Sequence, residues 1–324
     1  MFSSRSLRFL ALLSVAAIFA LNLGYLRSQT NERQPHISNN LATYALALAF
    51  GDDFTQSATD PDNSGWLAHL QRFYDRRMDV LNRGFAQHTS SDARKIAHQI
   101  LPKTNTNTSP GLSWTGPRLN SLPRQDGRSS LHLLIIAFGA NDAVPDETSP
   151  QHVPLTMFAE NLRYIVSLLR SPDSEHYSPH TRILFVTPPP VGDLMYAEST
   201  HIGSKVPRKN QVTRMYAEAM NAVAGELGLP CVDLWSAIEF MVKKAVDRVP
   251  LVAAARTGIL GTDQLAVQST LKSIYGSHLS PVSPFGGYEM YLADGFALNA
   301  NGNRLLHKLL ISKILTTWPE LRPY

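Results

Sequence analysis

The sequence predicts an α/β fold in which helices cover both faces of a parallel sheet. From about residue 41 onward, short apolar runs alternate with stretches whose apolar residues recur at helical spacing. Each apolar run ends at turn residues, which is typical of strands that are buried on both faces. Strands that alternate with helices along the chain favour a parallel sheet.

Four apolar runs are the predicted strands. They are Leu41–Phe50, Leu131–Gly139, Arg182–Thr187 and the shorter Cys231–Trp235. In parallel sheets, ligands bind outside the carboxyl ends of the strands. The residues directly after each run are therefore the first candidates for chemistry.

The predicted helices lie between and after these strands. In Pro154–Leu169, one stripe holds Leu155, Phe158, Leu162, Ile165 and Leu169, which is the pattern of a helix that packs on a core. Residues 207–228 and 302–317 also read as helices. Two stretches break the alternation: 103–130 reads as a surface insertion, and 243–290 as a lid or loop excursion.

The first 38 residues form a separate N-terminal segment, which leaves 39–324 as one domain. Arg5 and Arg8 precede the apolar run Phe9–Tyr25, which is the layout of a secretory signal peptide or an uncleaved signal-anchor. A mitochondrial presequence is the alternative. A glycosylation sequon at Asn107 agrees with the secretory pathway. We therefore expect a secreted protein, or one held at the membrane by this segment if it stays uncleaved.

Charge and motif content exclude several classes of function. Residues 1–38 carry +3 of the formal net charge of +4, so the remaining chain is nearly neutral and no nucleic-acid partner is expected. The single cysteine, Cys231, excludes a disulfide framework and a cysteine-based zinc site. The dinucleotide, P-loop, G-x-S-x-G and H-E-x-x-H motifs are missing. No cofactor or metal is predicted, and no oligomeric state is indicated.

Four segments at the predicted strand ends and in the last loop carry the remaining signal. They are FGDDFTQ (50–56), LNRGF (81–85), FGAND (138–142) and DGFALN (294–299). Together with GWLAHL (65–70) and QHVPL (151–155), their order and spacing resemble the SGNH (GDSL) hydrolases, most closely the isoamyl-acetate-hydrolysing esterase group. The resemblance implies a three-layer α/β/α sandwich with a flavodoxin-like sheet, and acyl-transfer chemistry.

The resemblance also assigns site residues one by one. Gly84 and Asn141 match the glycine and the asparagine that hold the oxyanion in this family. Asp294 matches the aspartate that orients the catalytic histidine. The position of the nucleophilic serine is occupied by Asp53, and the position of the histidine by Ala297. The stabilising half of the site is thus kept, while the reactive half is replaced.

Two functions follow from this pattern. Asp53 has no hydroxyl, Ala297 cannot transfer a proton, and a carboxylate at position 53 opposes the charge of an oxyanion. The preferred hypothesis is a non-catalytic protein that binds a small neutral ester or acid, with Gly84, Asn141 and Asp294 kept in part for turns and caps. The alternative is an active carboxylic-ester hydrolase that uses a rearranged site, with Ser57 or His278 as a substitute group.

Overall fold

A computed structural model describes residues 45–103, 131–145, 147, 149–199, 208–244 and 285–323. These residues belong to one unit, Tyr44–Tyr324. The predicted leader, the sequon at Asn107, His278 and most of both predicted insertions lie outside the described residues. Within the described part of the chain, no helix is both long and apolar enough to span a bilayer.

The centre of the fold is a five-stranded sheet in which every neighbouring pair of strands is parallel. The strands are β1 (Ala45–Gly51), β2 (Met78–Gly84), β3 (Leu131–Ala137), β4 (Arg182–Val186) and β5 (Cys231–Val232), and their order in space is β2-β1-β3-β4-β5. The predicted parallel sheet is confirmed. The strand β2 was not among the predicted runs, because its sequence MDVLNRG is polar at several positions and only partly buried.

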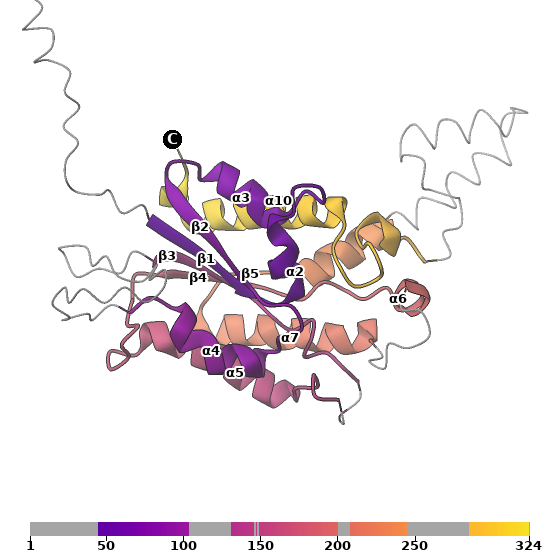
Figure 1. Cartoon of the computed structure of the whole chain (residues 1–324), viewed down its shortest axis with the longest axis horizontal. Coiled ribbons are helices and arrows are strands. Elements are labelled where there is room, and N and C mark those ends of the chain that lie inside the picture. The colour runs from indigo at the N-terminus through magenta and orange to yellow at the C-terminus, as the bar shows by residue number, and fades with distance from the viewer. Residues whose placement is uncertain are drawn as a thin grey trace, which may run out of the picture. The chain divides into compact units, whose positions relative to one another are not determined.

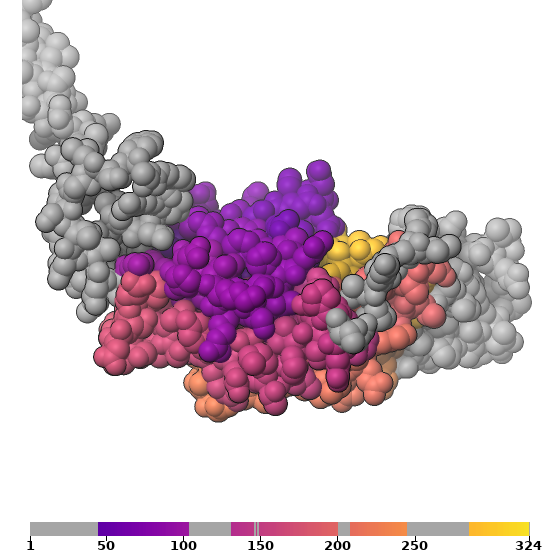
Figure 2. Space-filling view, turned by 60° about the horizontal axis from the view of Figure 1, so that its bottom comes forward, coloured from indigo at the N-terminus to yellow at the C-terminus, as the bar shows by residue number. Residues whose placement is uncertain are grey.

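Two layers of helices cover the sheet, one on each face (Figure 1). One layer holds α3 (Trp66–Phe73), α10 (Ala300–Thr317) and the helical residues 234–244. The other layer holds α4 (Ser90–Ile100), α5 (Leu155–Arg170) and α7 (Asn210–Leu227). Figure 2 is turned so that the layer of α4, α5 and α7 comes toward the viewer, with purple and magenta segments side by side and orange at the lower edge.

Each face of the sheet has its own apolar core because side chains alternate along a strand. On β3, Leu133 and Ile135 pack in the cluster with α3 and α10. Their neighbours Leu134 and Ile136 pack in the cluster with α4, α5 and α7. The three-layer α/β/α arrangement is therefore built from strands that are apolar on both faces.

The three predicted helices are confirmed, with small shifts at their ends. Pro154–Leu169 corresponds to α5, 207–228 to α7 and 302–317 to α10. Short helical turns complete the described chain: α2 (Asp53–Gln56), η1 (Ser57–Thr59), α6 (Asp193–Ser199), η2 (Tyr288–Met290) and η3 (Pro319–Leu321).

The strand order determines where a site can form. After β1 the chain moves to one side of this strand to make β2, and then to the other side to make β3. The connections on the two sides of β1 diverge, and such a switch point leaves a crevice at the carboxyl ends of the strands. Asp52 and Asp53 follow β1, and Asn141 follows β3, so the candidate residues flank this point.

Candidate functional site at the ends of β1, β2 and β3

Close backbone packing brings the ends of β1 and β2 against α2. A Cβ atom added to Gly84 would lie 2.0 Å from the backbone nitrogen of Gln56, and one added to Gly51 would lie 2.4 Å from the carbonyl oxygen of Ala137. Only glycine fits at such positions. The N–H of Gly84 donates to Oδ1 of Asn82 at 2.8 Å, while Nδ2 of Asn82 donates to the Thr55 carbonyl at 2.9 Å. Gly84 thus fixes the approach of β2 to the turn that carries Asp53.

Asp53 begins α2 and is half-buried. Its Oδ2 accepts a hydrogen bond from the backbone N–H of Gln87 at 2.8 Å and one from Nδ2 of Asn141 at 2.5 Å. The N–H of Gln87 can reach this carboxylate because Gln87 adopts a left-handed conformation with φ of 63°, which few residues other than glycine adopt. Two donors from two different loops therefore converge on one oxygen of Asp53.

Asn141 is buried and has hydrogen bonds at both ends of its amide. Its Nδ2 also donates to the carbonyl of His88 at 3.0 Å, and its Oδ1 accepts from Nη2 of Arg208 at 3.0 Å. These contacts fix the direction of the amide, with nitrogen toward Asp53 and oxygen toward Arg208. The structure thus joins Asp53 and Asn141, as expected from the sequence, and adds Gln87 and Arg208.

Arg208 lies just before α7 and is only 7% exposed. Its guanidinium also donates to the carbonyl of Ala140 and to Oε1 of Gln151, the latter at 3.3 Å. It stacks over the ring of Phe296, 4.1 Å from the centroid. No carboxylate of the described residues forms an ion pair with Arg208 within 4.0 Å. Asn141 links the guanidinium of Arg208 to the carboxylate of Asp53.

Asp52 is completely buried beneath the site. Its Oδ2 accepts from the backbone N–H of Ala140 at 3.2 Å, while its Oδ1 has no partner among the described residues. Burial raises the pKa of Asp52 well above its usual value, and the negative charges of Asp53 and Asp142 raise it further. Protonation of Asp52 is therefore easier than protonation of an exposed aspartate.

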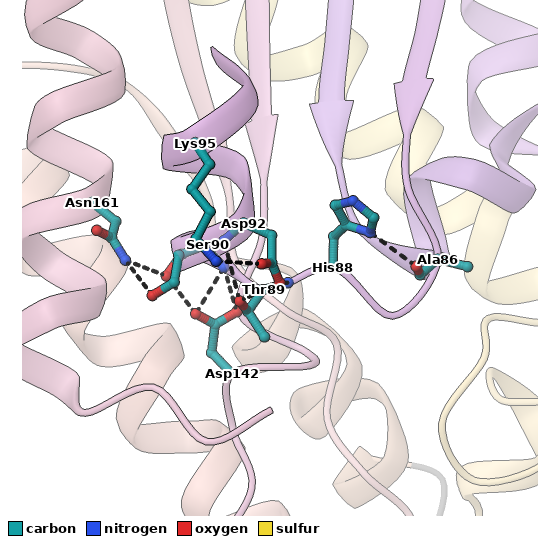
Figure 3. A network of polar contacts seen from close by, with 9 residues as sticks. Ala86, His88, Thr89, Ser90, Asp92, Lys95, Asp142 and Asn161 are labelled. Atoms are coloured by element: carbon teal, nitrogen blue, oxygen red, sulfur yellow. Dashed lines mark hydrogen bonds and ion pairs between the residues drawn. The ribbon is translucent and has the colours of Figure 1, made fainter. Parts of the chain in front are cut away.

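A second buried carboxylate, Asp142, anchors the loop that carries Gln87 and His88 (Figure 3). Both of its oxygens accept from the backbone N–H of Ser90, at 3.0 and 3.1 Å, and one of them also contacts the Ser90 hydroxyl. Nδ2 of Asn161 donates to the same hydroxyl at 3.0 Å. Burial raises the pKa of Asp142 to about 7. Asp142 thus ties the end of β3 to the first turn of α4.

The last predicted segment forms a turn that is braced by its own carboxylate and also contacts the α6 region, where the Ser199 hydroxyl donates to the Asp294 carbonyl at 2.7 Å and the Gly192 N–H donates to the Gly295 carbonyl at 2.8 Å. Oδ1 of Asp294 accepts from the backbone N–H groups of Phe296 and Ala297, at 2.8 and 2.7 Å. The carbonyl of Ala297 accepts from the N–H of Ala293 at 2.8 Å, and Gly295 has a φ of 86°. Asp294 therefore braces its own loop, and the described contacts give it no other side chain to orient.

The residues Asp53, Gly84, Gln87 and Asn141 form a strand-end cluster at the carboxyl ends of β1, β2 and β3. Phe296 brings the Asp294 turn next to this cluster, because its ring lies against Arg208. The five residues predicted from the sequence thus occur in two groups that Arg208 bridges. Of the two proposed substitutes, Ser57 is exposed and its hydroxyl donates to the Asp53 carbonyl at 3.0 Å, while His278 lies outside the described residues. No three His, Cys, Asp or Glu side chains of the described ranges gather in a way that could hold a metal ion.

Neither Gln87 nor Arg208 could be identified from the sequence. Gln87 contributes its backbone N–H, which every residue but proline has, so residue type carries no information there. Arg208 precedes a helix far along the chain from Asn141, and its role depends on tertiary packing alone.

Comparisons with known proteins agree with this arrangement. Residues 49–247 match the GDSL-like lipase/acylhydrolase family. An isoamyl acetate-hydrolyzing esterase 1 homolog from Bos taurus is 36% identical over 292 residues, which cover 89% of each chain. The Homo sapiens homolog of the same name is 33% identical over 282 residues, covering 86% of this chain and 85% of that protein. A GDSL esterase/lipase from Arabidopsis thaliana is 31% identical over 195 residues, covering 59% and 70%. This chain, with a parallel α/β/α fold and its strand-end cluster, therefore belongs to the GDSL (SGNH) lipase/acylhydrolase family.

Proposed function

We propose that this chain is a non-catalytic member of the family that uses the old reaction site to bind a small molecule. The observation that carries the proposal is the position of the Asp53 carboxylate, which accepts the hydrogen bonds of Gln87 and Asn141. In an acyl transfer, donors of this kind stabilise the negative oxygen that develops on the substrate. Here the protein supplies the negative oxygen itself.

Two chemical losses support the proposal. A carboxylate at position 53 cannot attack an ester as a serine hydroxyl does, and any acyl anhydride it formed would still need a base to activate water. Ala297 offers no such base. Among the described residues, the carboxylate of Asp53 has no hydrogen bond to a histidine.

The proposal is tested by ester hydrolysis with the full chain. Isoamyl acetate and a short nitrophenyl ester are incubated with purified protein, and release of acid and of nitrophenol is followed. We expect no turnover above that of the same protein after heat denaturation.

The active-hydrolase alternative makes the opposite prediction. Turnover that is lost in Asp53→Asn or in His278→Ala, and is kept in Ser57→Ala, would overturn the proposal. Turnover that is lost only in Ser57→Ala would overturn it as well, and would identify Ser57 as the substitute nucleophile.

A further inference from the structure

The hydrogen-bond donors and acceptors of the site indicate which class of ligand it can bind, if the proposed binding function holds. Both donors described above, the N–H of Gln87 and Nδ2 of Asn141, are directed at Oδ2 of Asp53. They are therefore already occupied when a ligand arrives. The ligand meets the other carboxylate oxygen, Oδ1, for which no hydrogen bond is found among the described residues. That oxygen can only accept.

Arg208 fixes the orientation of the Asn141 amide, and therefore which atoms of the site can donate or accept hydrogen bonds. Because Nη2 of Arg208 donates to Oδ1 of Asn141, the amide of Asn141 cannot turn its nitrogen away from Asp53 without placing two donors, or two acceptors, face to face. The guanidinium is itself held by the Ala140 carbonyl and by Gln151. The site therefore offers an acceptor to the ligand, whereas an oxyanion hole offers donors.

The balance of charge narrows the ligand class further. The positive charge of buried Arg208 lies one amide away from the negative charge of Asp53. These two charges offset each other at short range. A neutral donor satisfies the free oxygen without adding an uncompensated charge, whereas a carboxylate would be repelled by Asp53.

We propose that the site binds a small alcohol through its hydroxyl group, which donates to Oδ1 of Asp53, and that it discriminates against ketones, esters and carboxylates. Specificity is thus the reverse of that of an ester-hydrolysing site, which recognises a carbonyl oxygen. Asp53 is the residue that determines it, and Arg208 and Asn141 hold Asp53 in place.

The test uses the full chain and three probes of similar size: isoamyl alcohol, isobutyl methyl ketone and isovalerate. Affinities are measured by ligand-observed NMR titration. A hydrogen bond to a charged group contributes enough that we expect the alcohol to bind ~10-fold or more tightly than the ketone. Isovalerate should bind more weakly than both.

Two variants of Asp53 reverse the preference in different ways. In Asp53→Asn, the amide oxygen takes the place of Oδ2 and the NH2 group takes the place of Oδ1, so the outward atom becomes a donor. The ketone should then bind at least as tightly as the alcohol. In Asp53→Ala, the N–H of Gln87 and Nδ2 of Asn141 lose their acceptor, and isovalerate should gain ~10-fold or more in affinity. Asp62→Asn, at an exposed carboxylate outside the site, is the matched control and should leave the order unchanged.

The inference is wrong if the unmodified chain binds the ketone or isovalerate as tightly as the alcohol, if it binds none of the probes, or if Asp62→Asn changes the order as Asp53→Asn does. Hydrolysis of isoamyl acetate, followed in the same samples, reports on the proposed function independently of the affinity order. Turnover would overturn that proposed function, whereas a wrong order without turnover would overturn only the ligand class.

Discussion

The strand-end cluster and the Asp294 turn differ in how their side chains are used. In the cluster, Asp53 is bound by groups from two other loops, Gln87 and Asn141. In the turn, Asp294 binds the backbone of its own loop, at Phe296 and Ala297. Position 53 thus contacts two other loops at the strand ends, while position 297 lies in a turn that the Asp294 carboxylate braces. The two positions that the family resemblance singles out therefore differ in their structural surroundings.

The largest effect is expected when both regions are changed together. The double variant Asp53→Ser with Ala297→His restores a hydroxyl beside Asn141 and a base on the Asp294 turn. Since a positioned general base contributes ~10²–10⁴-fold to rate, we expect kcat/KM for isoamyl acetate to exceed that of either single variant by about 100-fold.

Equal activity in the single and double variants would contradict this prediction. It would show that the Asp294 turn no longer presents position 297 to position 53. Circular dichroism of all three variants serves as the control for folding.

A second comparison concerns the glycines that shape the two regions. In Gly84→Ala, the new Cβ would lie 2.0 Å from the Gln56 nitrogen, between a strand and α2, and we expect a loss of ~3 kcal/mol in the free energy of unfolding. Gly295→Ala is also strained, with a Cβ 2.3 Å from the Tyr196 nitrogen and a backbone φ of 86°, and a loss of similar size, ~3 kcal/mol, is expected. Urea unfolding measures both.

Gly225→Ala provides the control for these two variants. Gly225 lies inside α7, and no atom outside its own helix lies within 4 Å of a Cβ added there. Alanine should therefore raise stability by ~0.5–1 kcal/mol, through higher helix propensity. A loss at Gly225 similar to that at Gly84 would show that glycine replacement in general, and not the close contact, is responsible.

Arg208 connects the two regions, and its replacement should affect both. Arg208→Met keeps most of the length of the side chain but leaves the carbonyl of Ala140 and Oδ1 of Asn141 without their donor. A loss of ~1–3 kcal/mol is expected. Arg214→Met, at an exposed arginine inside α7, should change stability by less than ~0.5 kcal/mol. Equal losses in the two variants would argue against a bridging role.

Part of the pH dependence of stability comes from Asp142, at the end of β3. The pKa of Asp142 is about 7 in the folded protein and 3.8 for the ordinary group, so the folded state binds the proton more tightly. Its contribution to stability is complete below 3.8 and is lost as the pH rises through about 7. The expected size is on the order of 1–2 kcal/mol, allowing for relaxation around the buried group.

Urea unfolding over this pH range, with the unmodified chain and Asp142→Asn, checks the prediction. The variant should show a weaker decline in stability with rising pH. The difference between the two proteins isolates Asp142 from other titrating groups, such as Asp52, whose pKa is also raised, and His307, whose pKa burial lowers to about 4. A decline of unchanged slope would mean that Asp142 titrates in the same way in the folded and unfolded chain.

The smallest effect is expected at Asp294. Asp294→Ala removes an acceptor of two backbone N–H groups, but the turn is only half-buried and water can replace the carboxylate. A loss of about 1 kcal/mol or less is expected. A loss larger than that of Arg208→Met would contradict the view that this turn is locally braced and energetically separate.

Much of the fold could be predicted because the central strands are apolar on both faces. The runs at Leu131–Gly139 and Arg182–Thr187 contain β3 and β4. The edge strand β2 could not be predicted in this way, since polar residues such as Asp79 and Asn82 interrupt its pattern.

The site could be predicted only in part. Asp53, Asn141 and Asp294 follow strands or lie in a motif, so their positions were readable from the sequence. The contacts that define the polarity of the site come from a backbone N–H of Gln87 and from Arg208, which is 67 residues away from Asn141 in the chain. Such contacts depend on how loops meet in space.

The Asp53 carboxylate is an intramolecular acceptor that the chain holds permanently near Gln87 and Asn141. Because it is attached to the chain, its effective concentration at Gln87 and Asn141 lies far above the ~mM value that a short flexible linker provides. A free acid must compete with this tethered group for the same two donors. Under the proposed function, an external anion therefore reaches Gln87 and Asn141 only when it displaces Asp53.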